Sequence, residues 1–155
     1  MNFESLTEII DFAIEKEIEA AGFYEEVSRQ EAMSGAREML LEFSQEEKKH
    51  QKMLEELKTK GAVGEISEYK FTWIPDIKRS NFVVEMEYKQ GMAYHELLML
   101  AMKREETALK LYNQLLKQAE DENSKNLFKM LCQEEAKHKL ALETKYDDYM
   151  AQMGD

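Results

Sequence analysis

Cysteine, proline and glycine are scarce in this chain of 155 residues, which has one cysteine, one proline and six glycines. The single cysteine, Cys132, excludes an intramolecular disulfide and any metal site built mainly from thiolates. Such sparing use of cysteine suits a reducing compartment, and we expect a cytoplasmic protein. The scarcity of proline and glycine removes the residues that most often interrupt helices.

Basic residues are outnumbered, since 21 Lys and Arg against 32 Asp and Glu give a net charge of −11. Nucleic acids and anionic membrane surfaces attract basic faces, so we expect neither as a partner. No stretch approaches the length of about 18 uninterrupted apolar residues that a membrane span needs. Residues 1–10 also lack the features of a secretory signal, and we expect none there.

Four segments carry apolar residues at spacings of three and four, which is typical of amphipathic helices. The connection between the second and third segments is long and contains Pro75, which suits a crossover running along a bundle. We predict an all-α four-helix bundle that forms a single domain over residues 1–155. Its predicted parts are helices at about 5–30, 34–60, 92–119 and 122–150, which form hairpins at about 5–60 and 92–150 joined by a crossover at 61–91.

The second half of the chain repeats the first at an interval of 88 residues. In both halves a histidine follows a glutamate by 33 residues, from 17 to 50 and from 105 to 138. The matches gather around polar residues on the apolar faces, and not only around apolar residues. The matching pairs are Glu17 and Glu105, Tyr24 and Tyr112, Glu46 and Glu134, Glu47 and Glu135, and His50 and His138.

Six polar residues interrupt the apolar helix faces and are the candidate metal ligands: Glu17, Glu47, His50, Glu105, Glu135 and His138. Because Glu and His are three residues apart in the second and fourth helices, both members of each pair reach one point. A buried carboxylate without a counter-charge costs several kcal/mol, and no Lys or Arg lies on these faces. Two divalent cations would balance the negative charges. Carboxylate and imidazole ligands suit iron or manganese, and zinc would also bind.

One glutamate from each of two helices plus Glu-x-x-His from each of the other two resembles the ferritin-like di-iron carboxylate pattern. The sequence is similar to rubrerythrin-related members of that superfamily. The residues that carry the resemblance are Glu17 with Tyr24, residues 47–50, Glu105 with Tyr112, and residues 135–138. The resemblance implies a ferritin-like fold with a long crossover between the second and third helices.

The resemblance also implies two iron ions with Glu47 and Glu135 as the bridging carboxylates. The implied ligand sets are Glu17, Glu47 and His50 around one ion, and Glu105, Glu135 and His138 around the other. Tyr24 and Tyr112 would each hydrogen-bond a ligating glutamate, with plain core packing as the alternative. Glu46 and Glu134 fall beside the ligating faces, and we interpret them as solvated or as contacting the ligands.

The chain departs from rubrerythrin in two ways. It has no Cys-x-x-Cys pairs and hence no rubredoxin-type iron centre, so an external protein is expected to donate electrons. Rubrerythrin also carries an extra glutamate on its third helix, five residues before the tyrosine, where this chain has Thr107. That glutamate takes part in the iron site of rubrerythrin.

The resemblance implies a non-haem di-iron oxidoreductase, of the peroxidase or ferroxidase type, that reduces peroxide or dioxygen during oxidative stress. An alternative is an iron-binding or ferroxidase-type protein that handles iron without peroxidase turnover. A third hypothesis is a scaffold with structural metal, which the open coordination positions disfavour. We also expect a homodimer, because four phenylalanines lie off the metal-facing sides: Phe3, Phe12, Phe23 and Phe82.

Overall fold

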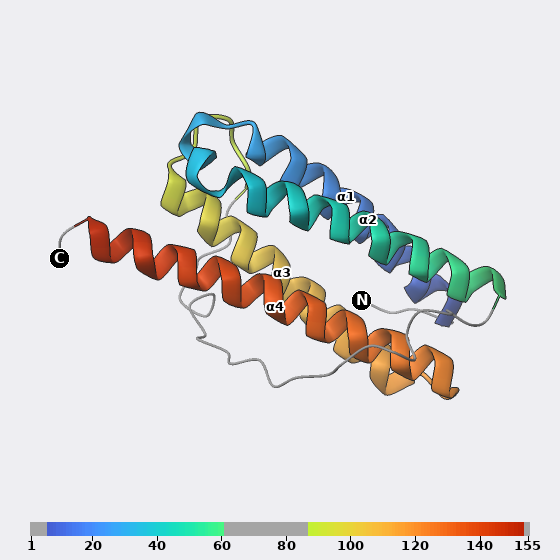
Figure 1. Cartoon of the computed structure of the whole chain (residues 1–155). Coiled ribbons are helices and arrows are strands. Elements are labelled where there is room, and N and C mark those ends of the chain that lie inside the picture. The colour runs from blue at the N-terminus through green and yellow to red at the C-terminus, as the bar shows by residue number, and fades with distance from the viewer. Residues whose placement is uncertain (1–5, 61–86, 154–155) are drawn as a thin grey trace.

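The computed structural model of the chain describes residues 6–60 and 87–153. Over these ranges it contains α1 (Leu6–Ser28), the 3₁₀ helix η1 (Glu31–Ala36), α2 (Arg37–Lys60), α3 (Tyr94–Gln118) and α4 (Glu122–Gln152). Figure 1 shows α1 beside α2, and α3 beside α4, in one bundle. The prediction of an all-α four-helix bundle is confirmed.

The direction of the helices explains why the connection between the two hairpins is long. In Figure 1, α2 and α3 run the same way along the bundle, so α3 begins at the end opposite to the one where α2 finishes. Most of the predicted crossover, residues 61–86, lies outside the described residues. None of the helices in the described ranges is long and apolar enough to cross a membrane.

Local interactions determine where two of the helices begin. The predicted start of the second helix at about 34 is three residues too early, because Glu31–Ala36 forms the tighter η1 and buries Met33 and Ala36, and α2 begins only at Arg37. Asp121 caps α4, since its carboxylate accepts a hydrogen bond of 2.9 Å from the backbone N–H of Ser124. This bond satisfies one of the N–H groups that a helix leaves without a partner at its first turn.

Two apolar clusters fill the bundle, and each takes residues from all four α-helices. The first includes Ile9, Leu54, Leu115 and Leu127. The second includes Val27, Leu40, Leu98 and Leu142. Along every helix, the six candidate ligands come between the residues of the first cluster and those of the second. The polar residues therefore form a layer across the middle of the bundle, enclosed by apolar side chains at both ends.

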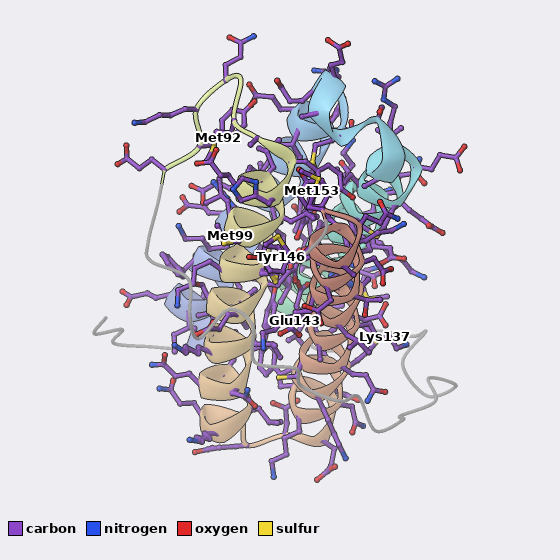
Figure 2. All side chains as sticks on the ribbon, turned by 90° about the vertical axis from the view of Figure 1, so that its left-hand side faces the viewer. Met92, Met99, Lys137, Glu143, Tyr146 and Met153 are labelled. Carbon is purple, nitrogen blue, oxygen red and sulfur yellow. The ribbon has the colours of Figure 1, made fainter. Side chains whose placement is uncertain are left out.

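The structure also contains a buried ion pair on α4 that the sequence pattern did not reveal. The Nζ atom of Lys139 lies 3.9 Å from the Oε2 atom of Glu143, and the two side chains are 7% and 1% exposed. Figure 2 shows Glu143 and Tyr146 on the side of α4 that faces α3, with Lys137 on the opposite side. The repeat matches Glu143 with Glu55, which is exposed. Two glutamates that match in the repeat therefore differ in burial.

The cap of α4 gives a prediction about stability. We expect Asp121→Ala to lower the free energy of unfolding by about 1 kcal/mol, because the N–H of Ser124 loses its acceptor. In a chain of this length such a change lowers the melting temperature by roughly 2–4 °C. Asp121→Ser keeps a side-chain oxygen and should retain most of the stability. Thermal unfolding followed by circular dichroism tests this, and equal melting temperatures for the Ala and Ser variants would contradict it.

Candidate metal centre

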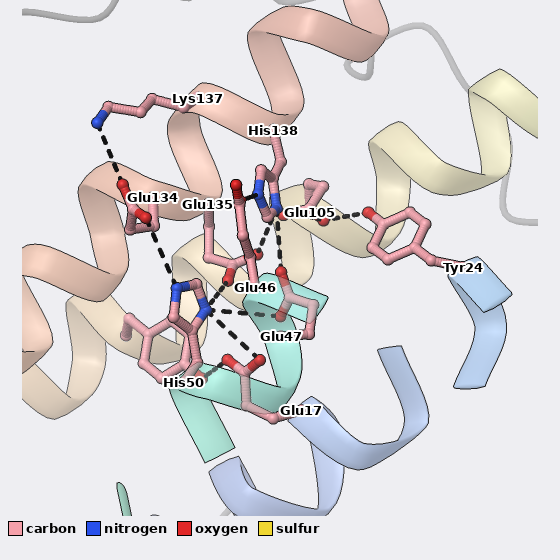
Figure 3. Close-up of polar contacts among 11 residues, drawn as sticks. Glu17, Tyr24, Glu46, Glu47, His50, Glu105, Glu134, Glu135, Lys137 and His138 are labelled. Atoms are coloured by element: carbon pink, nitrogen blue, oxygen red, sulfur yellow. Dashed lines mark hydrogen bonds and ion pairs between the residues drawn. The ribbon is translucent and has the colours of Figure 1, made fainter. Parts of the chain in front are cut away.

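All six candidate ligands lie in the polar layer and are nearly inaccessible to solvent. Their side chains belong to residues that are between 1% and 3% exposed. One comes from α1, two from α2, one from α3 and two from α4; they are Glu17, Glu47, His50, Glu105, Glu135 and His138. Figure 3 shows these side chains converging on one region between the helices. The structure thus brings together the complete predicted set.

The six residues form two overlapping groups with the geometry to hold metal ions. One group is Glu17, Glu47, His50 and Glu135, and the other is Glu47, Glu105, Glu135 and His138. Within each group, one potential ligand atom per residue lies within 4.8 Å of all the others. Glu47 and Glu135 belong to both groups, which is the placement that bridging carboxylates need.

Both imidazole rings direct Nδ1 toward the carboxylates of the layer. The Nδ1 atom of His50 lies 3.2 Å from Oε1 of Glu135 and 3.7 Å from Oε2 of Glu17. The Nδ1 atom of His138 lies 3.0 Å from Oε1 of Glu47. A metal ion at either position would meet Nδ1 and several carboxylate oxygens together.

Two buried tyrosines link the halves of the chain through the site. The hydroxyl of Tyr24, on α1, donates a short hydrogen bond to Glu105 on α3. The hydroxyl of Tyr112, on α3, donates a short hydrogen bond to Glu17 on α1. Burial raises the pKa of both phenols well above 10.0, and the neighbouring carboxylates raise it further. The phenols therefore stay protonated and act as donors.

The buried carboxylates have very different proton affinities. Burial raises the pKa of Glu17 and Glu135 well above 4.5, and nearby carboxylates add to this. Burial alone would also raise the pKa of Glu47, but its close polar contacts with Glu17 and the two histidines outweigh it and lower the pKa well below 4.5. Protons on Glu17 and Glu135 therefore relieve part of the repulsion when no cation is bound.

The pKa values of the two histidines are raised, although burial alone would lower them. Burial alone would lower the pKa of His50, but the nearby carboxylates of Glu134, Glu135 and other glutamates raise it well above 6.5. The pKa of His138 is also raised, because the charge of Glu105 and hydrogen bonds to carboxylates outweigh its burial. Imidazolium charges and carboxyl protons thus occupy the place that metal charge would take.

The polar atoms of the layer fit a pair of metal ions. Among the candidate ligands, four buried atoms have no partner in hydrogen-bonding geometry within the described ranges: Oε2 of Glu17, Oε1 of Glu47, Oε2 of Glu105 and Nδ1 of His138. A buried polar atom without a partner costs about 1–3 kcal/mol, so a pair of cations that bind these atoms is favoured. The donor set is carboxylate and imidazole, which suits iron, manganese or zinc.

Two other residues that the sequence singled out do not contribute to the layer. Thr107 is exposed, and its hydroxyl donates a hydrogen bond of 3.0 Å to the carbonyl oxygen of Lys103. It therefore supplies no ligand in place of the extra glutamate of rubrerythrin. Burial raises the pKa of Cys132 to about 11, so its thiol stays protonated.

Glu46 and Glu134 lie next to the ligating histidines, although the sequence placed them only beside the ligating faces. Oε2 of Glu46 makes a short contact with Nε2 of His138. Oε1 of Glu134 lies 3.8 Å from Nε2 of His50. Their match across the repeat, directly before each Glu-x-x-His, was the signal in the sequence for a shared role.

The bundle and its layer of glutamates and histidines place the chain in the ferritin-like class of carboxylate metal proteins. The Rubrerythrin family model matches residues 8–146, and the chain belongs to that family. A solved structure, a hypothetical protein from Pyrococcus furiosus, is similar with 28% identity and a TM-score of 0.70. The match covers 93% of this chain and 89% of that one. A search of curated proteins found no significant match.

The pKa shifts give a prediction about the metal-free protein. We expect its free energy of unfolding to fall as the pH rises from about 5 to 8, because the folded chain holds protons that the unfolded chain releases. The contributions of Glu17 and Glu135 are complete below their ordinary pKa of 4.5, and those of His50 and His138 below 6.5. Each contribution is lost progressively as the pH rises from that value through the raised pKa of the folded chain. The lowered pKa of Glu47 affects stability mainly below pH 4.5, which is outside this range.

Urea unfolding of chelator-treated protein at several pH values measures this dependence. Metal affinity should follow the opposite trend, since bound metal displaces these protons. An unfolding free energy that rises steadily over the same pH range would contradict the prediction.

Glu135→Gln separates metal binding from folding. The raised pKa of Glu135 means that glutamine resembles the protonated side chain, so metal-free stability should change by no more than about 1 kcal/mol. Because Glu135 belongs to both ligand groups, affinity for both ions should fall by at least about tenfold. Zinc titration and urea unfolding measure the two effects. Glu55→Gln is the matched control on an exposed position, and wild-type affinity in Glu135→Gln would contradict the prediction.

Proposed function

We propose that the chain is a di-iron redox protein that reduces peroxide or dioxygen with electrons from an external donor protein. The observation that carries the proposal is the pair of overlapping ligand groups that share Glu47 and Glu135. Two iron ions held there would each cycle between the ferrous and ferric states. Hydrogen peroxide needs two electrons and two protons to become two water molecules, and two ferrous ions match that electron demand.

The residues around the layer would keep the ligand geometry constant as the metal charge changes. Tyr24 and Tyr112 donate to Glu105 and Glu17, and these bonds hold one oxygen of each carboxylate. The other oxygen, Oε2, has no hydrogen-bond partner within the described residues and is available to a metal ion. The apolar clusters on both sides exclude bulk water from the layer.

The exposed position of Thr107 favours a second candidate function. Without a carboxylate at that place, the layer offers six ligands instead of the seven implied for rubrerythrin. A protein that oxidises or holds ferrous iron, with little peroxidase turnover, would need no additional carboxylate. We therefore keep ferroxidase-type iron handling as the alternative.

The proposed partners are an electron-donor protein and a second copy of the chain. The chain supplies no cysteine pairs for its own electron-transfer centre. Of the four phenylalanines that suggested a dimer, Phe23 is buried within the bundle and Phe12 is partly buried against it, while Phe3 and Phe82 lie outside the described residues. Ile18 and Leu41 are 50% and 40% exposed and are better candidates for a homodimer contact.

Elemental analysis of anaerobically purified protein, followed by peroxide addition to the ferrous-loaded form, tests the proposal. We expect two irons per chain and a rapid rise in the near-ultraviolet absorption of ferric iron. Fast oxidation by dioxygen with slow oxidation by peroxide would support the ferroxidase alternative. Tightly bound metal that responds to neither oxidant would contradict both, and Glu135→Gln controls for iron bound outside the layer.

A further inference from the structure

We propose that Glu46 and Glu134 are positioning residues that hold the proton of His138 and His50 on Nε2, and so leave Nδ1 free to bind metal. The inference rests on the proposed di-metal function and deepens it. It assigns a role to a second pair of carboxylates, outside the ligand set, that lies at the surface of the polar layer.

The two imidazole rings have the same orientation relative to the layer. In each ring Nδ1 faces the buried carboxylates, whereas Nε2 faces a glutamate outside the ligand set (Figure 3). Nε2 of His138 meets Oε2 of Glu46, and Nε2 of His50 meets Oε1 of Glu134. Because two independent rings make the same arrangement, it follows from the repeat and not from one local rotamer.

Each of these contacts crosses from one half of the chain to the other. Glu46 is on α2 and contacts a histidine of α4, while Glu134 is on α4 and contacts a histidine of α2. In both halves the glutamate directly precedes the ligating glutamate. A substitution in one half should therefore affect the histidine of the other half, which is a specific and testable pattern.

A neutral imidazole carries one proton, and the partner of one nitrogen determines which nitrogen is left to bind metal. A carboxylate at Nε2 keeps the proton there, orients the ring and increases the basicity of Nδ1. Glu46 and Glu134 are 39% and 21% exposed, so they reach the layer from its solvent side. Lys137 lies 3.1 Å from Oε2 of Glu134 and holds that carboxylate beside the ring.

The two positions are not equivalent. Glu46 is in direct contact with His138, whereas 3.8 Å separates Glu134 from His50. The Glu46 contact should therefore contribute more to its histidine than the Glu134 contact does. The difference would make the two metal positions unequal in affinity, although their ligand sets match across the repeat.

The test uses the full chain with ¹⁵N-labelled histidine and zinc as the probe metal. Long-range ¹H–¹⁵N spectra report which ring nitrogen holds the proton, and His95 on α3 serves as an internal reference. In wild-type protein we expect zinc on Nδ1 and the proton on Nε2 in both His50 and His138. We expect Glu46→Ala to perturb the Nε2–H signal of His138 alone and Glu134→Ala to perturb that of His50 alone.

Zinc competition with a chelator gives a second readout. Loss of such a partner typically weakens metal affinity by roughly 10- to 100-fold, and we expect this for one of the two ions in each alanine variant. Glu46→Gln, whose amide oxygen still accepts from Nε2, should restore the histidine signal and much of the affinity. Glu42→Gln removes a charge from an exposed position one turn earlier on α2 and should leave both readouts unchanged.

The outcomes separate this inference from the proposed function. Wild-type protein that binds no zinc would overturn the proposed function, and this inference with it. Two bound ions together with unchanged signals and affinities in the alanine variants would overturn the inference alone. Equal perturbation of both histidines by either variant would also overturn it. If an alanine variant loses its helical circular dichroism, the glutamine variant at the same position replaces it in both measurements. A smaller loss of zinc affinity is then expected.

Discussion

The central constraint on this fold is the burial of four carboxylates in one layer of an apolar bundle. Glu17, Glu47, Glu105 and Glu135 are each no more than 2% exposed. Such groups repel one another and lose hydration, and both effects oppose folding. In the metal-free chain, protons and the charges of two imidazolium rings reduce this cost, and the tyrosine hydroxyls stabilise two of the carboxylates. A pair of divalent cations would offset the same cost, so the burial of the carboxylates favours metal binding.

Many contacts that organise the layer join a residue of one half of the chain to a residue of the other half. Tyr24 donates a hydrogen bond to Glu105 of the second half, and Tyr112 donates one to Glu17 of the first half. The histidines meet carboxylates of the opposite half in the same way. Neither hairpin alone could complete the site, because each supplies only one partner of the tyrosine–glutamate hydrogen bonds and of the shortest contacts between Nδ1 and a carboxylate. The docking of the two hairpins and the formation of the site are therefore one event, and the apolar clusters on both sides supply its driving force.

The repeat is nevertheless incomplete, and its exceptions are where the halves differ in environment. On α4, Lys139 and Glu143 are buried as an ion pair, whereas the matching residues on α2, Gln51 and Glu55, form a hydrogen bond of 2.9 Å at an exposed site. A buried pair of charges contributes little net stability but penalises arrangements that separate the partners. The second half of the chain thus differs from the first beside the metal layer, although the six ligands themselves match.

The sequence by itself determined the helices, their pairing into hairpins and the identity of the six buried candidate ligands. These follow from periodicity, since a glutamate among Ala13, Ala20 and Tyr24 must enter the core with them. Tertiary structure alone decided which tyrosine meets which glutamate, which nitrogen of each histidine faces the layer, and that Lys139 and Glu143 are buried. Those features depend on the distance and rotation between helices far apart in the chain. The spacing of residues along one helix carries no information about these quantities.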